Sequence, residues 1–244
     1  MGCLPLFGDS SCDYYNIKSA NRSVMSKTRS VTNVKCAEGS ANDLFADNLW
    51  PGCYVLSDIL DSNPYLCRSK SVLELGAGSA LPSLVASVLG ASIVVTSDYP
   101  EPSVIQNIEE VCKSNNLNDI IVEPYAWGGT TEPLLSHLCS TEGTTNKFDL
   151  ILCAELLWKD TYIKHEDLLK SIAYSLDENV GIAIVTFVHR PTECHSPTQD
   201  LEFFEKAKRL YRMQYKHMGI CRKYKDCLDD SDDYAAVQVY VLYF

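Results

Sequence analysis

A carboxylate and two glycines stand together in Val72-Leu73-Glu74-Leu75-Gly76-Ala77-Gly78. The apolar residues predict a buried strand that ends at Leu75, and the residues after Gly78 predict the start of a helix. Gly76 and Gly78 let the backbone turn tightly and approach a ligand closely. The helix N-terminus behind them presents unpaired N–H groups and a partial positive charge. The segment therefore predicts a ligand site at a strand-to-helix turn.

The residues around this turn distinguish between two nucleotide cofactors. A dinucleotide fingerprint has a third glycine, where this chain has Leu81, and this difference disfavours NAD. The Glu74 carboxylate suits a cationic ligand such as the methionyl ammonium of S-adenosylmethionine, and the glycine turn can meet the rest of that tail. The alternative is that Glu74 is a buried carboxylate satisfied by its own fold. We expect S-adenosylmethionine as the cofactor.

Three further side chains follow the predicted strands or precede the first predicted helix. Asp98 ends the second strand, where its carboxylate can accept hydrogen bonds from both ribose hydroxyls, although it could instead cap the next helix. Trp127 follows the third strand and could cover an adenine, or it could be a core tryptophan. Trp50 could cap the same pocket, or it could only hold the first helix in place.

Candidates for the chemical step follow the fourth and fifth strands. Glu155 and Trp158 lie in Ala154-Glu155-Leu156-Leu157-Trp158, where Glu155 could hold a substrate amine and Trp158 could face its developing positive charge. Glu155 could equally support neighbouring groups or lie at the surface. No Asn/Asp-Pro-Pro-aromatic segment stands here, which counts against a nucleobase substrate. His189 could line the substrate channel or stiffen its loop.

The elements that position these residues alternate between strands and helices. We expect strands at 71–75, 92–97, 120–122, 148–155 and 180–188, and helices from Pro51 and at 79–89, 102–115, 132–139, 165–176 and 199–211. This order predicts an α/β fold with a mostly parallel sheet. Strands at 220–224 and 236–243, joined by a loop at 226–233, predict a closing hairpin that adds an antiparallel strand. We expect two regions, an N-terminal arm or lid over 1–47 and one catalytic domain over 48–244.

Composition excludes several classes of protein. The 244 residues carry a net charge of −11, all of it in residues 71–244, because residues 1–70 hold seven basic and seven acidic side chains. This acidity disfavours direct nucleic-acid binding and suits a cationic partner. Eleven cysteines without CxxC spacing predict free thiols in a reducing compartment and no metal site. No stretch resembles a membrane span or a secretory signal, and Leu6 disfavours myristoylation, so we expect a cytoplasmic protein.

Six segments in order resemble the seven-strand protein methyltransferases of the lysine-methyltransferase-like group, over about residues 45–244. They are LWPG (49–52), VLELGAGSALPSL (72–84), VVTSDYP (94–100), YAWG (125–128), FDLILCAELLW (148–158) and FVHRP (187–191). The similarity is strongest to the branch that methylates elongation factor 1-alpha at its N-terminus and at a lysine, once labelled nicotinamide N-methyltransferase-like.

The resemblance implies a Rossmann-like seven-strand sheet, mostly parallel with one antiparallel strand, helices on both faces, and S-adenosylmethionine as cofactor. By motif position it implies cofactor contacts from Trp50, Gly76, Ala77, Gly78, Asp98, Trp127 and Ala154. Glu74 and Tyr99 complete the candidate cofactor-binding residues. Glu155 stands where we expect Asp in that branch, and Trp158 replaces a smaller aromatic, so the departures concern the substrate side.

Three functions remain open from the sequence. The first is a protein N-methyltransferase that acts on the N-terminal α-amine and the adjacent lysine of translation elongation factor 1-alpha. The second is a small-molecule N-methyltransferase of the nicotinamide type, with the N-terminal arm as a lid. The third is a protein that binds S-adenosylmethionine without catalysing transfer.

Overall fold

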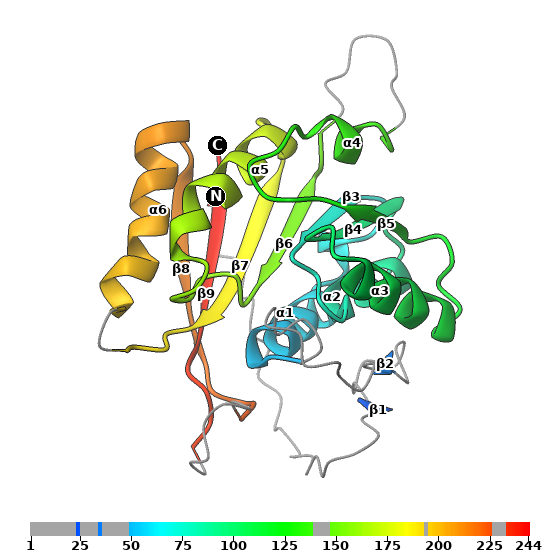
Figure 1. Cartoon of the computed structure of the whole chain (residues 1–244), viewed down its shortest axis with the longest axis horizontal. Helices are drawn as coiled ribbons and strands as arrows, with labels where there is room; N and C mark the ends of the chain where they lie inside the picture. The colour runs from blue at the N-terminus through cyan, green and yellow to red at the C-terminus, as the bar shows by residue number, and fades with distance from the viewer. Residues whose placement is uncertain (1–22, 25–33, 36–48, 139–146, 193–194, 226–232) are drawn as a thin grey trace.

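Seven strands form one sheet in the order β5, β4, β3, β6, β7, β9, β8 (Figure 1). This computed structural model describes residues 23–24, 34–35, 49–138, 147–192, 195–225 and 233–244. The bounds are β3 Ser71–Leu75, β4 Ile93–Asp98, β5 Ile121–Pro124, β6 Leu150–Ala154, β7 Ile182–Val188, β8 Gln214–Cys221 and β9 Val237–Tyr243. The prediction for β3 agrees with the structure at both ends, because a polar residue and a glycine flank its apolar run.

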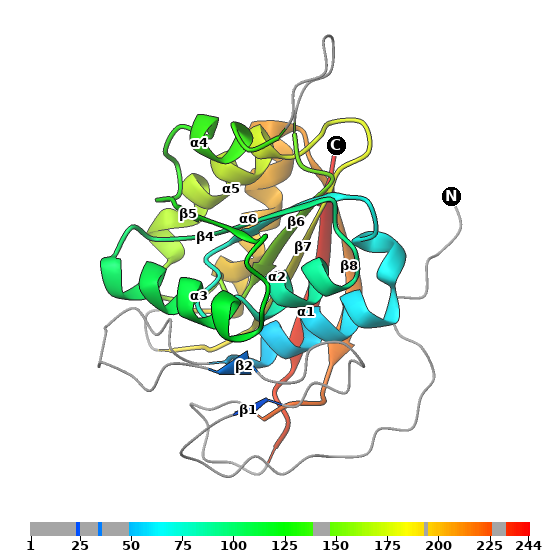
Figure 2. The same ribbon diagram turned by 90° about the vertical axis from the view of Figure 1, so that its right-hand side faces the viewer.

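Helices cover both faces of the sheet, as Figure 2 shows in side view. One face carries α1 (Pro51–Ser62), α2 (Leu81–Val88) and α3 (Pro102–Ser114), and the other carries α4 (Glu132–Leu135), α5 (His165–Ser175) and α6 (Pro197–Tyr211). Two short 3-10 turns, η1 (Pro64–Leu66) and η2 (Tyr162–Lys164), connect elements. No described helix is both long and apolar enough to cross a bilayer.

The direction of the strands confirms a mostly parallel sheet with one antiparallel strand. β5, β4, β3, β6 and β7 run parallel to their neighbours, and β9 runs antiparallel to both β7 and β8. The carboxyl ends of the parallel strands therefore meet at one edge of the sheet. In open sheets of this kind, ligands bind at that edge.

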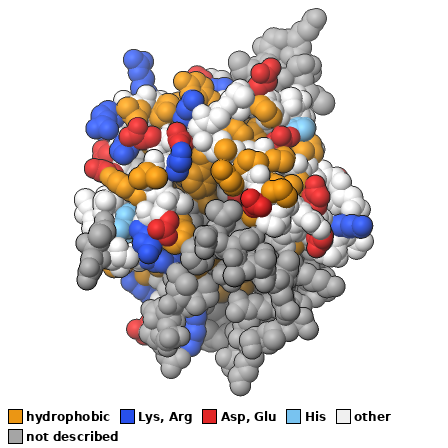
Figure 3. Space-filling view, viewed as in Figure 1, with side chains coloured by type: hydrophobic (Ala, Val, Ile, Leu, Met, Phe, Trp, Pro, Cys, Tyr) orange, Lys and Arg blue, Asp and Glu red, His pale blue; other side chains and the backbone are white. Residues whose placement is uncertain are grey.

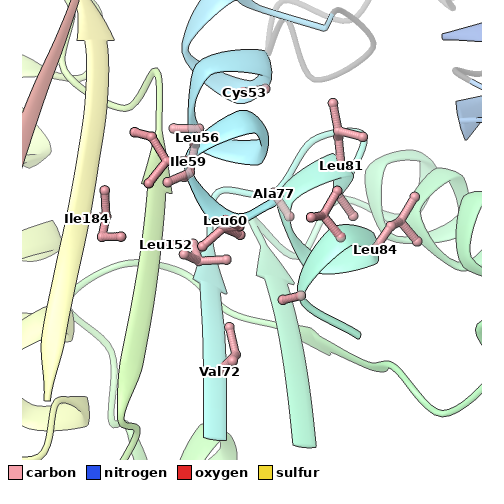
Figure 4. Close-up of a cluster of buried hydrophobic side chains, with 14 of the residues drawn as sticks. Cys53, Leu56, Ile59, Leu60, Val72, Ala77, Leu81, Leu84, Leu152 and Ile184 are labelled. Carbon is pink, nitrogen blue, oxygen red and sulfur yellow. The ribbon is translucent and has the colours of Figure 1, made fainter. Parts of the chain in front are cut away.

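Two hydrophobic cores hold the layers together. Figure 4 shows the core between the sheet and the first two helices, where Leu60 of α1 lies beside Leu152, and Leu56 and Leu84 belong to the same cluster as Val72. The second core packs α5 and α6 on the opposite face of the same strands. Because β3, β6 and β7 are buried on both faces, their sequences are mostly apolar without alternation, and Glu74 in β3 and Thr186 in β7 are buried polar exceptions.

The closing hairpin begins earlier than predicted. β8 starts at Gln214 rather than at residue 220, since this edge strand is only partly buried and therefore lacks a regular apolar alternation. Its register shifts between His217 and Gly219, which further disrupts the alternation of inward and outward side chains along the strand. Helix α4 ends at Leu135, earlier than the predicted Cys139. Most of the hairpin loop predicted at 226–233 lies outside the described residues.

Only short pieces of the predicted N-terminal arm fall within the described residues. β1 (Ser23–Val24) pairs antiparallel with β2 (Val34–Lys35), and β2 lies beside α3. The boundary between residues 47 and 48 stays a prediction.

Candidate functional site

The turn between β3 and α2 uses the backbone freedom that the two glycines provide. Gly76 and Gly78 have φ values of 62° and 53°, in the left-handed region that disfavours side chains. The Ala77 N–H donates to the Ser97 carbonyl at 3.0 Å, which fixes the turn against the end of β4. Ala80 is also left-handed and serves as the N-cap of α2.

A cradle forms where three loops meet over Gly76. A Cβ atom at Gly76 would lie 2.6 Å from Leu156 Cδ2 and 3.1 Å from Trp127 Cζ2. The structure thus brings Trp127, which follows β5, and Leu156, which follows β6, to the glycine turn. Only a residue without a side chain fits this position.

Asp98 lies at the end of β4, as predicted, and reaches the glycine turn. Its Oδ2 accepts a hydrogen bond from the Gly78 N–H at 2.7 Å, and its Oδ1 accepts one from the Tyr99 N–H at 2.6 Å. Burial raises the pKa of this carboxyl. Glu101 occupies the N-cap position of α3, so Asp98 does not serve as its N-cap. Tyr99 is exposed beside it.

Glu74 is buried beneath the start of α2. Its side chain points away from the second core, and its Oε2 accepts a hydrogen bond from the Ser83 N–H at 2.9 Å. Burial raises the pKa of Glu74 to about 8, against an ordinary value of 4.5. This placement fits the alternative of a carboxylate satisfied by its own fold, while contact of Glu74 with a cofactor stays a prediction.

Glu155 follows β6 and is the centre of a buried ion pair. Its Oε1 accepts a hydrogen bond from the Gly52 N–H at 2.8 Å, and its Oε2 accepts bonds from Arg190 Nη1 at 2.7 Å and the Val188 N–H at 3.3 Å. Burial raises the pKa of Glu155, and the Arg190 guanidinium opposes that shift. The geometry shows a supporting group that joins α1, β6 and β7. A direct contact of Glu155 with a substrate amine stays a prediction.

The tryptophans predicted for the site are each partly buried. Trp50 is the N-cap of α1, and the Arg190 guanidinium carbon lies 5.1 Å from the centre of its ring. Ala154 is the buried last residue of β6. Trp158 belongs to a turn in which its N–H donates to Thr161 Oγ1 at 3.2 Å.

Sequence reasoning missed Leu156 and Arg190. Leu156 forms one wall of the cradle, and Arg190 links the Glu155 carboxylate to the Trp50 ring. Arg190 stands directly after His189 in a segment that the sequence had already marked, so its guanidinium was an available signal for an acidic partner. Nothing local in the sequence identifies Leu156.

The residues at the turn fit an adenosyl cofactor. Gly76 and Gly78 leave the backbone of the turn without side chains, and Leu156 and Trp127 pack closely against Gly76. Ser79 Oγ, in the same turn, is buried and has no hydrogen-bond partner within the described part of the chain. Buried polar atoms are nearly always paired, so this hydroxyl is available to a ligand. Among the described residues, no group of His, Cys, Asp or Glu could hold a metal ion.

The fold is that of Rossmann-like methyltransferases. It has a mostly parallel sheet, a glycine turn and an acidic residue at adjacent strand ends, and an antiparallel β9. A precorrin-6y C5,15-methyltransferase from Geobacter metallireducens has a TM-score of 0.51 at 13% identity, and the similarity covers 76% of this chain and 87% of that one. TYW2 from P. horikoshii in complex with MeSAdo has a TM-score of 0.51 at 13% identity, covering 88% and 72%.

Residues 31–210 match the family described as lysine methyltransferase, and the chain belongs to that family. It is 35% identical over 204 residues to the protein N-terminal and lysine N-methyltransferase EFM7 of Candida glabrata, covering 80% of this chain and 74% of that one. The enzyme of the same name from Schizosaccharomyces pombe is 33% identical, and the match covers 69% of this chain and 65% of that one. The enzyme from Neurospora crassa is 35% identical, and the match covers 68% of this chain and 60% of that one. The chain thus spans about two thirds of the length of these relatives.

Proposed function

We propose that this chain is an S-adenosylmethionine-dependent protein N-methyltransferase. Its substrate is the N-terminal α-amine and the adjacent lysine of translation elongation factor 1-alpha, and it acts in the cytoplasm. The observation that carries the proposal is the 35% identity to a protein N-terminal and lysine N-methyltransferase over most of the chain, together with the glycine cradle that the fold requires at Gly76.

The cofactor supplies the methyl group, bound to a positively charged sulfur. The Gly76–Gly78 turn, with Ala77, would hold its amino acid end, and Glu74 lies buried beneath this turn as a further candidate contact. Asp98 would hold the ribose, and Tyr99, exposed beside it, would border it. Trp127 would cover the adenine, Trp50 would close the pocket from the start of α1, and Ala154, the last residue of β6, would border the methyl donor.

The chain's contribution to the reaction is positioning and exclusion of water. Methyl transfer to an amine is an in-line displacement, and correct alignment of the two reacting atoms supplies much of the rate. The Glu155–Arg190 pair fixes the ends of β6 and β7 relative to α1, and thereby the loops that border the donor. Trp158 lies on the loop after β6, where its ring can face the cationic amine.

The surface charge is consistent with a basic protein partner. The net charge of −11 favours approach of a cationic segment. On the face shown in Figure 3, acidic and basic side chains are interspersed over α5 and α6. We propose no direct contact with nucleic acid or with a membrane.

The test is transfer of labelled methyl from S-adenosylmethionine to recombinant elongation factor 1-alpha, with the Asp98→Ala variant as a control for cofactor binding. Mass spectrometry of the N-terminal peptide should locate the added methyl groups on the α-amine and the neighbouring lysine. Parallel reactions contain nicotinamide in place of the protein. Label in nicotinamide alone would favour the small-molecule enzyme, and cofactor binding without any transfer would favour a binding protein.

A further inference from the structure

Two histidines share one buried carboxylate beside the carboxyl end of β7. Asp200, in the first turn of α6, is only 1% exposed. Its Oδ2 lies 2.7 Å from His189 Nδ1, and its Oδ1 lies 2.6 Å from His195 Nε2. No step of the proposed function described above uses this cluster.

The carboxylate determines which nitrogen of His189 remains available. When Asp200 is ionised it accepts a hydrogen bond from Nδ1–H, so a neutral His189 ring carries its lone pair on Nε2. His189 Nε2 has no hydrogen-bond partner among the described residues, and the His189 side chain is 21% exposed. The Phe187 ring packs at right angles to the imidazole, with centroids 5.1 Å apart, and restricts its orientation. A base held in place by a third group is the usual arrangement for proton transfer.

His189 borders the edge of the sheet where the amine would be methylated. It directly follows Val188, whose N–H donates to the Glu155 carboxylate after β6. The loop after β6 reaches the same cluster, because the Tyr162 ring of η2 packs edge-on against His195 with centroids 5.8 Å apart. The loops after β6 and β7 thus meet at the contact between Tyr162 and His195, beside the carboxylate that His189 and His195 share.

The other carboxylates of the site are already engaged. Both oxygens of Glu155 accept hydrogen bonds from Gly52, Val188 or Arg190. Asp98 accepts two backbone N–H groups, and Glu74 lies under α2. None of these three groups is as well placed as His189 Nε2 to accept a proton from a substrate.

We propose that His189 accepts the proton that the substrate ammonium must lose before methylation, and that Asp200 is its positioning residue. This inference rests on the proposed function. One N–H bond of the ammonium breaks, its electron pair remains on the substrate nitrogen, and the proton forms the new bond to His189 Nε2. The neutral amine then has the lone pair that the displacement needs. Asp200 stabilises the imidazolium, which returns its proton to solvent.

The charged and titratable groups around His189 come from every neighbouring element. They are Glu155 after β6, Arg190 after β7, Tyr162 in η2, His165 in α5, His195 before α6, and Asp200, Glu202 and Lys206 in α6. Burial lowers the pKa of His165 to about 4, so that ring is neutral in the working range. The side chain of His195 is 3% exposed and the whole of His165 is 1% exposed, which leaves His189 as the more accessible histidine of this cluster.

The experiment is a pH–rate profile of methyl transfer to elongation factor 1-alpha for wild type, His189→Gln and Asp200→Asn. We expect His189→Gln to be on the order of 100-fold slower at pH 7, the usual contribution of a general base. The difference should shrink to less than about tenfold at pH 10, where hydroxide and solvent deprotonate the amine. His137→Gln is the matched control, because His137 also pairs with a carboxylate, Glu123 at 2.8 Å, and should match wild type.

The pH dependence of the rates distinguishes a proton-accepting role of His189 from a structural one. A His189→Gln rate equal to wild type, or reduced by the same factor at every pH, would overturn the proposal, since a merely structural role has no such pH dependence. If His189→Gln does not fold, His189→Ala with added imidazole is the second test, and rescue of its rate at pH 7 is expected. Absence of rescue in a folded variant that binds cofactor normally counts against a proton-accepting role. If wild type itself transfers no methyl to the protein at any pH, the proposed function fails instead.

Discussion

Substitution of Gly76 by Ala tests whether the cradle over the glycine turn is as tight as the structure indicates. Two costs apply at this position. A left-handed alanine costs about 1–2 kcal/mol, and the new Cβ would lie 2.6 Å from Leu156 Cδ2, so that Leu156 must move. Forcing an extra methyl group into a packed site costs about 1–3 kcal/mol. We therefore expect Gly76→Ala to lower the free energy of unfolding by about 2–5 kcal/mol.

Gly90→Ala is the control that separates the two costs. Gly90 also has a positive φ, 88°, but a Cβ there would meet no atom within 4 Å. We expect Gly90→Ala to lower the free energy of unfolding by about 1–2 kcal/mol. Urea unfolding measures this loss, provided that the variants and the wild type have equal m-values. Cofactor affinity, measured by calorimetry, should fall at least about tenfold for Gly76→Ala, which corresponds to about 1.4 kcal/mol, and stay unchanged for Gly90→Ala. Equal losses of stability in the two variants would refute the tight packing of Leu156 and Trp127 against Gly76.

Three further substitutions test the carboxylates. The wild type should lose stability as the pH rises from 5 to 8, and Glu74→Gln should remove this pH dependence. The folded pKa of about 8 exceeds the ordinary 4.5, so the folded state holds a proton that is lost as the pH rises; denaturant titrations should show a loss of a few kcal/mol in wild type only. Glu155→Gln should lower turnover and spare cofactor binding. It should also destabilise the fold by about 3–5 kcal/mol, because the Arg190 charge is left uncompensated. As a control, Glu178→Gln breaks an exposed ion pair to Lys147 and should cost less than about 1 kcal/mol. Asp98→Ala should weaken S-adenosylmethionine binding by about 1–3 kcal/mol in calorimetry, and an unchanged affinity would remove Asp98 from the site.

The sequence predicted the central strands well because burial there is continuous. Apart from Ser71, Glu74 and Thr186, the residues of β3 and β7 are apolar, and both strands are bounded by polar or glycine residues, so both type and position follow from the pattern. β8 gave no such signal, since its outer side chains are exposed and its register shifts at Gly219. The local pattern of an edge strand carries little information about pairing.

The site was predictable where its residues act through backbone geometry and not where they act through distant partners. The positions of the glycine turn and of Asp98 at a strand end were predicted from the sequence, and the structure joins them through the Gly78 N–H, while their role in the site stays a prediction. Glu155 was found as a residue but not as an ion pair, because Gly52 lies 103 residues away from it in the chain and Arg190 lies 35 residues away. Asp200 was also missed, although its partners His189 and His195 lie only 11 and 5 residues away, because no local pattern marks a carboxylate shared by two histidines.

The position of β9 has a consequence for how the chain is made. β9 follows every other described strand in sequence but lies between β7 and β8 in the sheet (Figure 1). During synthesis, β7 therefore presents an unpaired apolar edge until residues 237–243 have left the ribosome, a wait of several seconds at ordinary elongation rates. An exposed edge of this kind is a template for pairing with another chain. The nascent protein should therefore depend on chaperones at that stage, and stalled chains that end before β9 should aggregate.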